Sequence, residues 1–445
     1  MSRANYQPLH SLCAAMQRRL QDLLSLRTPL GRFMLARRVF HRAWPLMSRA
    51  ATIYRRTLAR NTCVVAVVGS FGKSTTMRAV HAALGIARPC SLENVSTSVP
   101  RVVLRLVPGQ RHAVLEVGIN APGQMTVHAR MLRPNITVVT SIGSDHNRSL
   151  KTLAVTRAEK AEMVRVLPAS GLAVLNGDDP NVCWMRSQTR ARVVTFGLSE
   201  TNDVRGSDIS LDWPHGTRFT VHVADESRRL RIRLIGKPHV YTILAAVAVA
   251  RSQGLSLDQI APALAALPPT PGRLEPIRLA SGAFVLRDDY KSSLETIDAA
   301  LDVLNEIPGR RIVVIGEVAE PVGSQGPIYR RIGERIGKSA SYAIFIGGKT
   351  GNTLMAGARQ AGLAHGNVIR ARDVHQAVQL LKDNLRAGDT VLIKGRDTQR
   401  FDRITLALTG RSVRCELRFC NIYPRCMQCT MLERDGRVSN AAVAG

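Results

Sequence analysis

A glycine-rich turn between a short apolar stretch and a candidate helix is the first feature that could do chemistry. Val64–Val68 runs into the string Gly69-Ser70-Phe71-Gly72-Lys73-Ser74-Thr75. Glycines let backbone N–H groups approach phosphates, and a helix N-terminus adds positive potential. In such a loop the lysine meets the β- and γ-phosphates and the serine binds Mg²⁺. The string predicts nucleotide binding by Gly69, Ser70, Gly72, Lys73, Ser74 and Thr75.

Two further candidate ligands accompany later apolar stretches. Glu116 lies at the end of one predicted strand, and Asp145-His146 follows the strand Ile136–Thr140. Because ligands of doubly wound sheets bind at the carboxyl ends of the strands, we expect Lys73, Glu116 and His146 to converge. A carboxylate and a neutral imidazole beside ATP phosphates suit Mg²⁺. Taken singly, Glu116 could equally be a capping acid and His146 a satisfied polar histidine.

Lys160 follows in a helical stretch, Thr156-Arg-Ala-Glu-Lys-Ala-Glu162. Of the 62 basic residues only nine are lysine, so this chain uses arginine about six times as often. A lysine here hints at a need for a primary amine, although a solvated helix face would also explain it.

The elements that must position these residues alternate between strands and helices, which predicts an α/β fold with a doubly wound parallel sheet. Asp208–Leu234 alternates apolar and polar residues and predicts antiparallel strands. A second, Rossmann-like α/β unit follows the Pro-rich linker that ends at Gly272. We expect a basic helical segment at 1–60, an ATP-binding domain at 61–271, a C-terminal α/β domain at 272–412 and a cysteine-rich tail at 413–445.

Composition narrows the class of protein. The 45% hydrophobic and 21% charged residues are ordinary for a globular chain of two or three domains. We find no apolar stretch of about 18 residues that could span a membrane. Arg18 and Arg19 interrupt the only candidate signal-peptide core, so we expect a cytoplasmic protein.

The formal charge of +29 is extreme. It reflects either the base composition of the genome or attraction to polyanions. Residues 1–60 hold twelve arginines and one acid, and their leucines recur at helical spacing. We predict two or three basic amphipathic helices there, which either pack on the body or contact an anionic surface, membrane or partner.

Four cysteines crowd the tail: Cys415, Cys420, Cys426 and Cys429. Four thiolates can form a tetrahedral Zn²⁺ site, and Cys-x₂-Cys is its common half. The other pair is more loosely spaced than usual, so free or redox-active thiols are the alternative to structural zinc.

The order of these motifs resembles the Mur ligase family, most closely its MurF branch, the UDP-N-acetylmuramoyl-tripeptide–D-alanyl-D-alanine ligases. The resemblance covers about residues 61–410. Besides the phosphate loop, the matching strings are Leu115-Glu-Val-Gly-Ile-Asn120, Ile142-Gly-Ser-Asp-His146, Lys160-Ala-Glu162, Ala173-Val-Leu-Asn-Gly-Asp-Asp-Pro180, Val194-Thr-Phe-Gly197, Gly272-Arg-Leu-Glu275, Asp288-Asp-Tyr290, Val314-Ile-Gly-Glu-Val-Ala-Glu320 and Val391-Leu-Ile-Lys-Gly395.

The resemblance implies an ATP-dependent ligase that joins a small-molecule or peptide carboxylate to an amine through an acyl-phosphate, with Mg²⁺. Lys73 would contact the γ-phosphate, and Lys160 would be carbamylated, which arginine cannot be. The remaining implied roles are Mg²⁺ ligation by Ser74, Glu116, His146 and Lys160, adenine contact by Asn176, closure onto the nucleotide by Arg273 and Asp288, and substrate orientation by Lys394.

Three departures concern the recognition of substrates. The family's Gly-x-His-Asn reads Gly236-Lys-Pro-His239, and MurF's Tyr-Asn-Ala-Asn-Pro reads Tyr290-Lys-Ser-Ser-Leu294. MurF's uridine-nucleotide-binding domain has no counterpart in the arginine-rich segment. We therefore expect a ligase whose carboxyl substrate can differ from the UDP-muramoyl peptide.

Two alternatives remain open at this point. The altered strings would also suit a nucleotide-binding scaffold without ligase activity, and the charge would suit a nucleic-acid-associated ATPase. With 4% aromatic residues and no aromatic-rich basic patch, specific nucleic-acid binding is not expected. The oligomeric state is not predicted.

Overall fold

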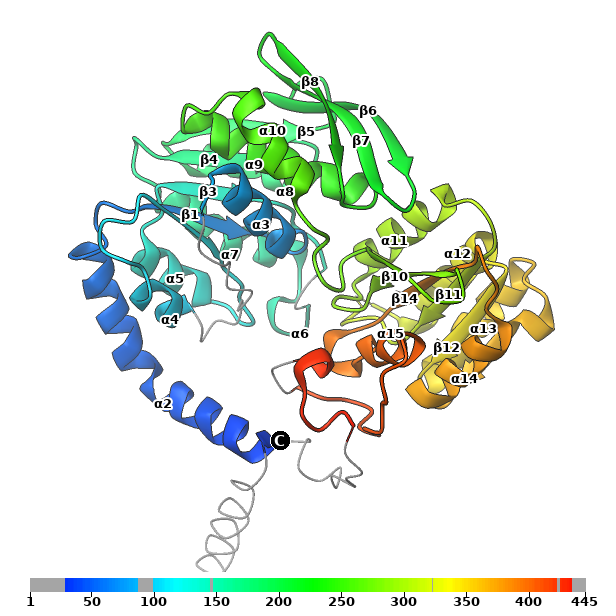
Figure 1. Ribbon diagram of the computed structural model, residues 1–445. Helices are drawn as coiled ribbons and strands as arrows, with labels where there is room; N and C mark the ends of the chain where they lie inside the picture. The colour runs from blue at the N-terminus through cyan, green and yellow to red at the C-terminus, as the bar shows by residue number, and fades with distance from the viewer. Residues whose placement is uncertain (1–28, 87–98, 145–146, 322, 422–424, 434–445) are drawn as a thin grey trace, which may run out of the picture.

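The computed structural model describes residues 29–86, 99–144, 147–321, 323–421 and 425–433. Two α/β units lie side by side, each built on its own sheet, with a long helix along one edge and the C-terminal tail beside the second unit (Figure 1). This confirms the predicted fold class.

The first sheet has eight strands among the described residues, in the order β2-β1-β3-β4-β5-β6-β7-β8. The first six strands of this order, from β2 to β6, pair in parallel. β7 then pairs antiparallel with both β6 and β8, as predicted for Asp208–Leu234. The strands are β1 (Cys63–Val68), β2 (His112–Glu116), β3 (Ile136–Val139), β4 (Leu172–Asn176), β5 (Arg192–Gly197), β6 (Val204–Asp212), β7 (Gly216–Val223) and β8 (Glu226–Ile232).

Helices cover both faces of this sheet (Figure 1). One core contains residues of α3, α9 and α10, and the other contains residues of α5 and α7. The helices are α3 (Lys73–Ala83), α4 (Val99–Leu104), α5 (Gln124–Leu132), α6 (Asn147–Leu150), α7 (Leu153–Arg165), α8 (Pro180–Cys183), α9 (Lys237–Ser252) and α10 (Leu257–Ala266). The apolar run Val240–Ala250 is the buried centre of α9.

The second sheet has the order β13-β12-β11-β14-β10-β9, parallel except for the edge strand β9. Its strands are β9 (Glu275–Arg278), β10 (Phe284–Asp288), β11 (Arg311–Ile315), β12 (Tyr342–Ile346), β13 (Val368–Ala371) and β14 (Thr390–Lys394). The helices are α11 (Leu294–Glu306), α12 (Gln325–Ser339), α13 (Lys349–Gln360), α14 (Val374–Asn384) and α15 (Asp402–Leu408).

One helix of the basic N-terminal segment, α2 (Pro29–Arg56), lies in the part of the chain that the structure describes. The predicted helices before residue 29 lie outside it. Arg55 is buried at the end of α2, where its Nε donates to the Leu132 carbonyl at 2.8 Å and its Nη1 donates to the Ala59 carbonyl at 2.6 Å. These bonds fix α2 to the central unit. Among the described helices, none is long and apolar enough to cross a membrane.

Candidate active site

The phosphate loop joins β1 to α3. Gly69 has φ +145°, and a Cβ there would lie 2.0 Å from Thr140 Oγ1, so no other residue fits beside the end of β3. Gly72, with φ +83°, turns the chain into α3. The ammonium of Lys73 is buried and donates to the carbonyls of Gly69 and Ser70 at 2.9 and 3.2 Å. The loop therefore holds its lysine against its own backbone.

Ser74 and Glu116 meet beside this loop. The Ser74 hydroxyl donates to Glu116 Oε2 at 2.7 Å, and Glu116 is 6% exposed at the end of β2. Two oxygen ligands fit Mg²⁺, which usually takes one or two protein ligands together with substrate phosphates. No group of three His, Cys, Asp or Glu side chains within the described residues could hold a metal ion by itself.

Lys160 lies behind the loop. It is 2% exposed on α7, and its Nζ donates to Ser70 Oγ at 2.8 Å. The same hydroxyl accepts from the backbone N–H of Gly143 at 2.8 Å, and so links α7, the loop and the end of β3. The structure thus brings Lys73, Ser74, Glu116 and Lys160 to one edge of the sheet. His146, predicted to join them, lies outside the described residues.

Asn176 is the last residue of β4, and its side-chain amide forms hydrogen bonds to two backbone groups. Its Nδ2 donates to the Thr140 carbonyl at 2.9 Å, and its Oδ1 accepts from the Asp178 N–H at 3.1 Å. These bonds fix the neighbouring strand end at the position where the resemblance implied adenine contact.

The second unit contributes a stack of cations on an aromatic ring. Arg273 lies over the Tyr290 ring at 4.2 Å, and Arg425 of the tail lies 4.8 Å from the same ring. Burial raises the pKa of Tyr290. His239, at one of the altered positions, donates from Nε2 to the Arg273 carbonyl at 3.3 Å, and burial lowers its pKa to about 4. His239 is therefore neutral near pH 7 and supports Arg273.

Asp288 and Lys394 form a buried pair at the ends of β10 and β14. Lys394 Nζ donates to Asp288 Oδ2 and to the Lys291 carbonyl, both at 2.6 Å. Burial lowers the pKa of Lys394, and the Asp288 carboxylate opposes that shift. The pair orders the backbone around residue 291 at the predicted nucleotide-facing end of the second sheet.

Lys291, in the altered string after Tyr290, was not predicted as a site residue. Its Nζ donates to the Ser70 carbonyl of the phosphate loop at 2.9 Å. Glu295 makes a parallel bridge, because its Oε1 accepts from the Ser144 N–H at 2.7 Å and its Oε2 from the Ser144 hydroxyl at 2.8 Å. Both bridges join the two units across the site. The scarcity of lysine in this chain was the one sequence clue to Lys291.

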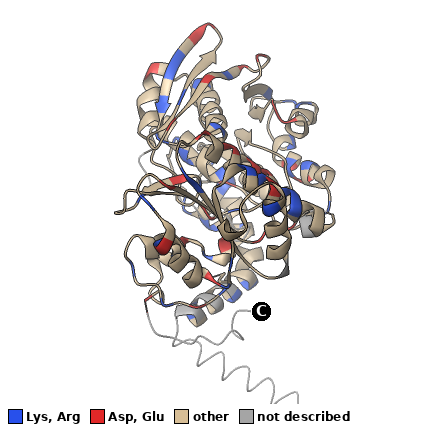
Figure 2. Cartoon of the chain, turned by 90° about the vertical axis from the view of Figure 1, so that its right-hand side faces the viewer, with Lys and Arg blue, Asp and Glu red and all other residues tan. Residues whose placement is uncertain are grey.

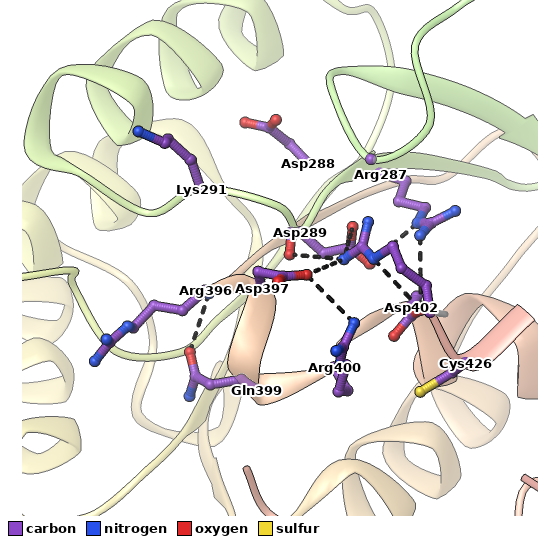
Figure 3. A network of polar contacts seen from close by, with 12 residues as sticks. Arg287, Asp288, Asp289, Lys291, Arg396, Asp397, Gln399, Arg400, Asp402 and Cys426 are labelled. Atoms are coloured by element: carbon purple, nitrogen blue, oxygen red, sulfur yellow. Dashed lines mark hydrogen bonds and ion pairs between the residues drawn. The ribbon is translucent and has the colours of Figure 1, made fainter. Parts of the chain in front are cut away.

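A network of charged side chains surrounds Asp289, the residue before Tyr290 (Figure 3). Arg287 Nε donates to Asp289 Oδ2 at 3.0 Å, and Arg425 lies 3.5 Å from Asp289 and 3.2 Å from Asp397. Burial and the neighbouring Asp289 raise the pKa of Asp402. In Figure 3, Lys291 points away from these carboxylates. The network therefore ties the tail residue Arg425 to the segment that carries Asp289 and Tyr290.

The predicted zinc site is not supported. The four tail cysteines are described, but no three metal-binding side chains of the described residues gather there. Instead, the buried guanidinium of Arg403 donates to Cys426 Sγ at 3.3 Å and to the Leu417 carbonyl at 2.6 Å. Burial raises the pKa of Cys426 to about 12. Cys426 thus lies in a buried, hydrogen-bonded place beside Arg403.

A cleft of about 540 Å³ opens beside the second sheet and reaches Lys151 of the first unit. Glu317 and Arg396 line it, with 3.8 Å between their charged atoms. A carboxylate and a guanidinium that share a cleft can receive the two charged ends of a small zwitterion.

Comparisons with known proteins agree with this geometry. Residues 67–250 match the Mur ligase middle domain, and residues 272–396 match the Mur ligase, glutamate ligase domain. A UDP-N-acetylmuramoyl-tripeptide–D-alanyl-D-alanine ligase of Mycobacterium tuberculosis is 31% identical over 392 residues, covering 82% of this chain and 76% of the relative.

Solved structures show the same fold. MurF from Acinetobacter baumannii superposes with a TM-score of 0.73 at 22% identity, covering 82% of this chain and 80% of that one. MurF ligase from Thermotoga maritima in complex with ADP gives 0.73 at 20% identity, covering 82% and 83%.

Proposed function

We propose, from the premise that the chain belongs to the Mur ligase family, that it joins a peptide carboxylate to the amine of an amino acid or dipeptide. The reaction class is ATP-dependent formation of an amide bond. The observation that supports the proposal most is the convergence of Ser74, Glu116 and Lys160 on one phosphate loop.

ATP would bind along this loop. The Lys73 ammonium would leave the carbonyls of the loop and bind the γ-phosphate. Ser74 and Glu116 would hold Mg²⁺, which neutralises charge on the transferring phosphoryl group. Lys160 would be carbamylated, a modification that needs an amine able to lose its proton, which arginine cannot do. His146 stays a proposed ligand of Mg²⁺, and Asn176 a proposed neighbour of adenine.

The carboxylate oxygen would attack the γ-phosphorus, forming an acyl-phosphate and releasing ADP. The amine nitrogen would then attack the acyl carbon, lose a proton and expel inorganic phosphate, which keeps one oxygen of the carboxylate. Lys291 and Glu295 tie the units together over the loop. Such closure excludes water from the acyl-phosphate. Arg273, Asp288 and Lys394 would order this closed edge.

The amine substrate would occupy the cleft lined by Glu317 and Arg396. Glu317 would receive its ammonium and Arg396 its carboxylate, which favours an amino acid or dipeptide with a free carboxyl end. D-alanyl-D-alanine, named for the relatives, has these two charges. We further propose that Gly272 divides the two catalytic domains, within the ranges 61–271 and 272–412, and that the reaction takes place in the cytoplasm.

The test is release of phosphate and ADP from Mg-ATP, measured over a matrix of carboxylates and amines. The carboxylates are UDP-N-acetylmuramoyl-tripeptide and the same peptide without its nucleotide, and the amines are D-alanyl-D-alanine, D-alanine and L-alanine. Turnover that needs one member of each set, with an amide product by mass, is expected. ATP binding without turnover on any combination would favour the nucleotide-binding scaffold.

Comparison of the peptide with and without its nucleotide shows which part of the carboxylate substrate the protein recognises. Equal turnover of the two carboxylates would place recognition in the peptide, as the altered strings around His239 and Lys291 lead us to expect. A strict requirement for the nucleotide would instead mean that the UDP group is bound, and the altered strings would then have another role.

A further inference from the structure

The outer side of α2 exposes a line of large apolar side chains. Leu35, Val39, Leu46 and Ile53 are 44, 56, 69 and 63% exposed. The last three repeat every seven residues, a spacing that turns by only about 20° per step on an α-helix. Four apolar side chains therefore form one continuous stripe along the helix.

Arginines follow the same repeat. Arg42, Arg49 and Arg56 each stand three residues after an apolar member of the stripe, which places them about 60° around the helix from it. All three are exposed. A ridge of guanidinium groups thus runs beside the apolar stripe along the helix.

The opposite side of α2 is covered along the C-terminal half of the helix. Ser48, Ala51 and Arg55 are buried, and the Trp44 ring meets the His128 ring of α5 edge to face at 6.5 Å. In Figure 1 the C-terminal half of the helix lies along the outer edge of the central domain, with α4 and α5 on its inner side, and the N-terminal half projects beyond the domain. The outward stripe is therefore not needed to attach the helix to the protein.

The charge of α2 also sets it apart from the rest of the molecule. Its 28 residues contain seven arginines and no acid, whereas blue basic and red acidic segments are interspersed through both domains in Figure 2. A helix surface without acids attracts anions along its whole length.

We propose that this face of α2, defined by Leu35, Val39, Leu46, Ile53 and the neighbouring arginines, docks on an anionic phospholipid bilayer. The apolar side chains would enter the headgroup boundary, and the arginines would pair with lipid phosphates. A nucleic acid would use the arginines but has no use for a line of exposed aliphatic side chains. A second copy of this chain would bring seven further arginines against them, which like-charge repulsion opposes.

The experiment is flotation of the full chain with vesicles. We expect binding to phosphatidylcholine vesicles that contain 40% phosphatidylglycerol as anionic lipid, and at least tenfold weaker binding to pure phosphatidylcholine. Raising salt from about 0.05 to 0.5 M should weaken binding by screening the arginines. Leu46→Asp with Ile53→Asp should lower binding at least tenfold, because both side chains would enter the boundary.

A matched pair of charge reversals separates a local face from the net charge of the whole chain. Arg42→Glu with Arg49→Glu changes the charge by the same amount as Arg229→Glu with Arg233→Glu, on and after β8. Each arginine near an anionic surface contributes about fivefold in affinity. We expect more than tenfold loss for the first pair and less than twofold for the second.

Three results would overturn the proposal. Equal losses in the two reversed pairs would mean that binding follows net charge alone. A wild-type dimer in solution that Leu46→Asp with Ile53→Asp converts to monomer would mean that a second copy covers the stripe. Binding to a 30-mer duplex DNA but not to anionic vesicles would assign the arginines to nucleic acid. Circular dichroism and ligase turnover of each variant confirm that it is folded.

Discussion

The two halves of the active site differ in how they are built. On the central domain, four side chains from three elements surround one loop, and each bond joins a side chain to the loop or to a neighbouring ligand: Lys73 to Gly69, Ser74 to Glu116, and Lys160 to Ser70. On the C-terminal domain the corresponding side chains bond mostly to one another, as Asp288 does with Lys394. We interpret the first as the ligand-centred half, where ATP is proposed to bind, and the second as the closure-centred half, which supports the proposed closure of the domains.

This difference explains what the sequence could predict. The phosphate loop, Glu116 and Lys160 follow recognisable strings at strand ends and in a helix, so their residue types and order were enough. Lys291 and Arg425 were missed because their partners lie far along the chain: Lys291 contacts Ser70, and Arg425 contacts Asp289.

The fold was predicted more completely than the site. Long β-branched runs such as Val64–Val68 are unmistakable as strands, and so is the alternation in β6–β8. The strands β9 and β13 were not predicted, because β9 contains Pro276 and β13 has only two β-branched residues before Arg370. Of the two alternatives left open for the cysteine tail, zinc is not supported, and spacing alone could not show that Arg403 bonds to Cys426 Sγ and to the Cys415 carbonyl.

The sharpest way to test the ligand-centred half is Lys160→Ala. Loss of the buried amine removes the carbamylation site, and we expect turnover to fall by about 10³-fold, or roughly 4 kcal/mol of transition-state stabilisation. Added bicarbonate should raise wild-type turnover and leave the variant unchanged. Lys382→Ala, an exposed lysine of α14, is the control and should retain full activity. Near-normal turnover of Lys160→Ala would exclude carbamylation as a requirement.

In the closure-centred half, we expect substitutions to lower the free energy of unfolding of the protein. Arg425→Ala removes one of the two arginines beside Asp289 and Asp402 and leaves Arg287 as their remaining buried cation. We expect the loss to lower the free energy of unfolding by about 3 kcal/mol. Urea denaturation measures this. Arg418→Ala, an exposed arginine of the same tail, should change stability by less than about 0.5 kcal/mol. Equal effects of the two changes would mean that the buried network does not stabilise the tail.

Lys291 connects the two halves, so its loss should weaken catalysis while leaving ATP binding intact. We expect Lys291→Ala to lower kcat about tenfold, because closure over the loop loses one bridge. Lys338→Ala on the exposed side of α12 is the control. A change in ATP affinity with kcat preserved would show that Lys291 binds nucleotide instead of closing the domains.

The last prediction concerns the pH dependence of stability at His128, which lies outside both halves of the active site. Burial lowers the pKa of His128 to about 4, and neither ring nitrogen has a hydrogen-bond partner among the described residues. Its unfolded pKa is near 6.5, so the unfolded chain binds the proton first as pH falls. The stability contribution is complete above pH 6.5 and is lost between 6.5 and 4, by roughly 1–2 kcal/mol at pH 5.

Substitution of this histidine separates its effect from that of His239, whose pKa is also lowered to about 4. His128→Leu should abolish about half of the loss between pH 6.5 and 5 and cost little at pH 7.5, since no hydrogen bond is removed. Thermal unfolding at the two pH values measures it. An unchanged pH dependence would mean that His128 is not the titrating group.

The most direct test of the ligase assignment follows one oxygen atom. A peptide substrate labelled with ¹⁸O in its reacting carboxylate is turned over with Mg-ATP and amine, and the phosphate is analysed by mass spectrometry. Attack of the carboxylate on the γ-phosphorus predicts one ¹⁸O in the phosphate for each amide formed. Unlabelled phosphate would mean that water attacked ATP, and the acyl-phosphate route would be contradicted.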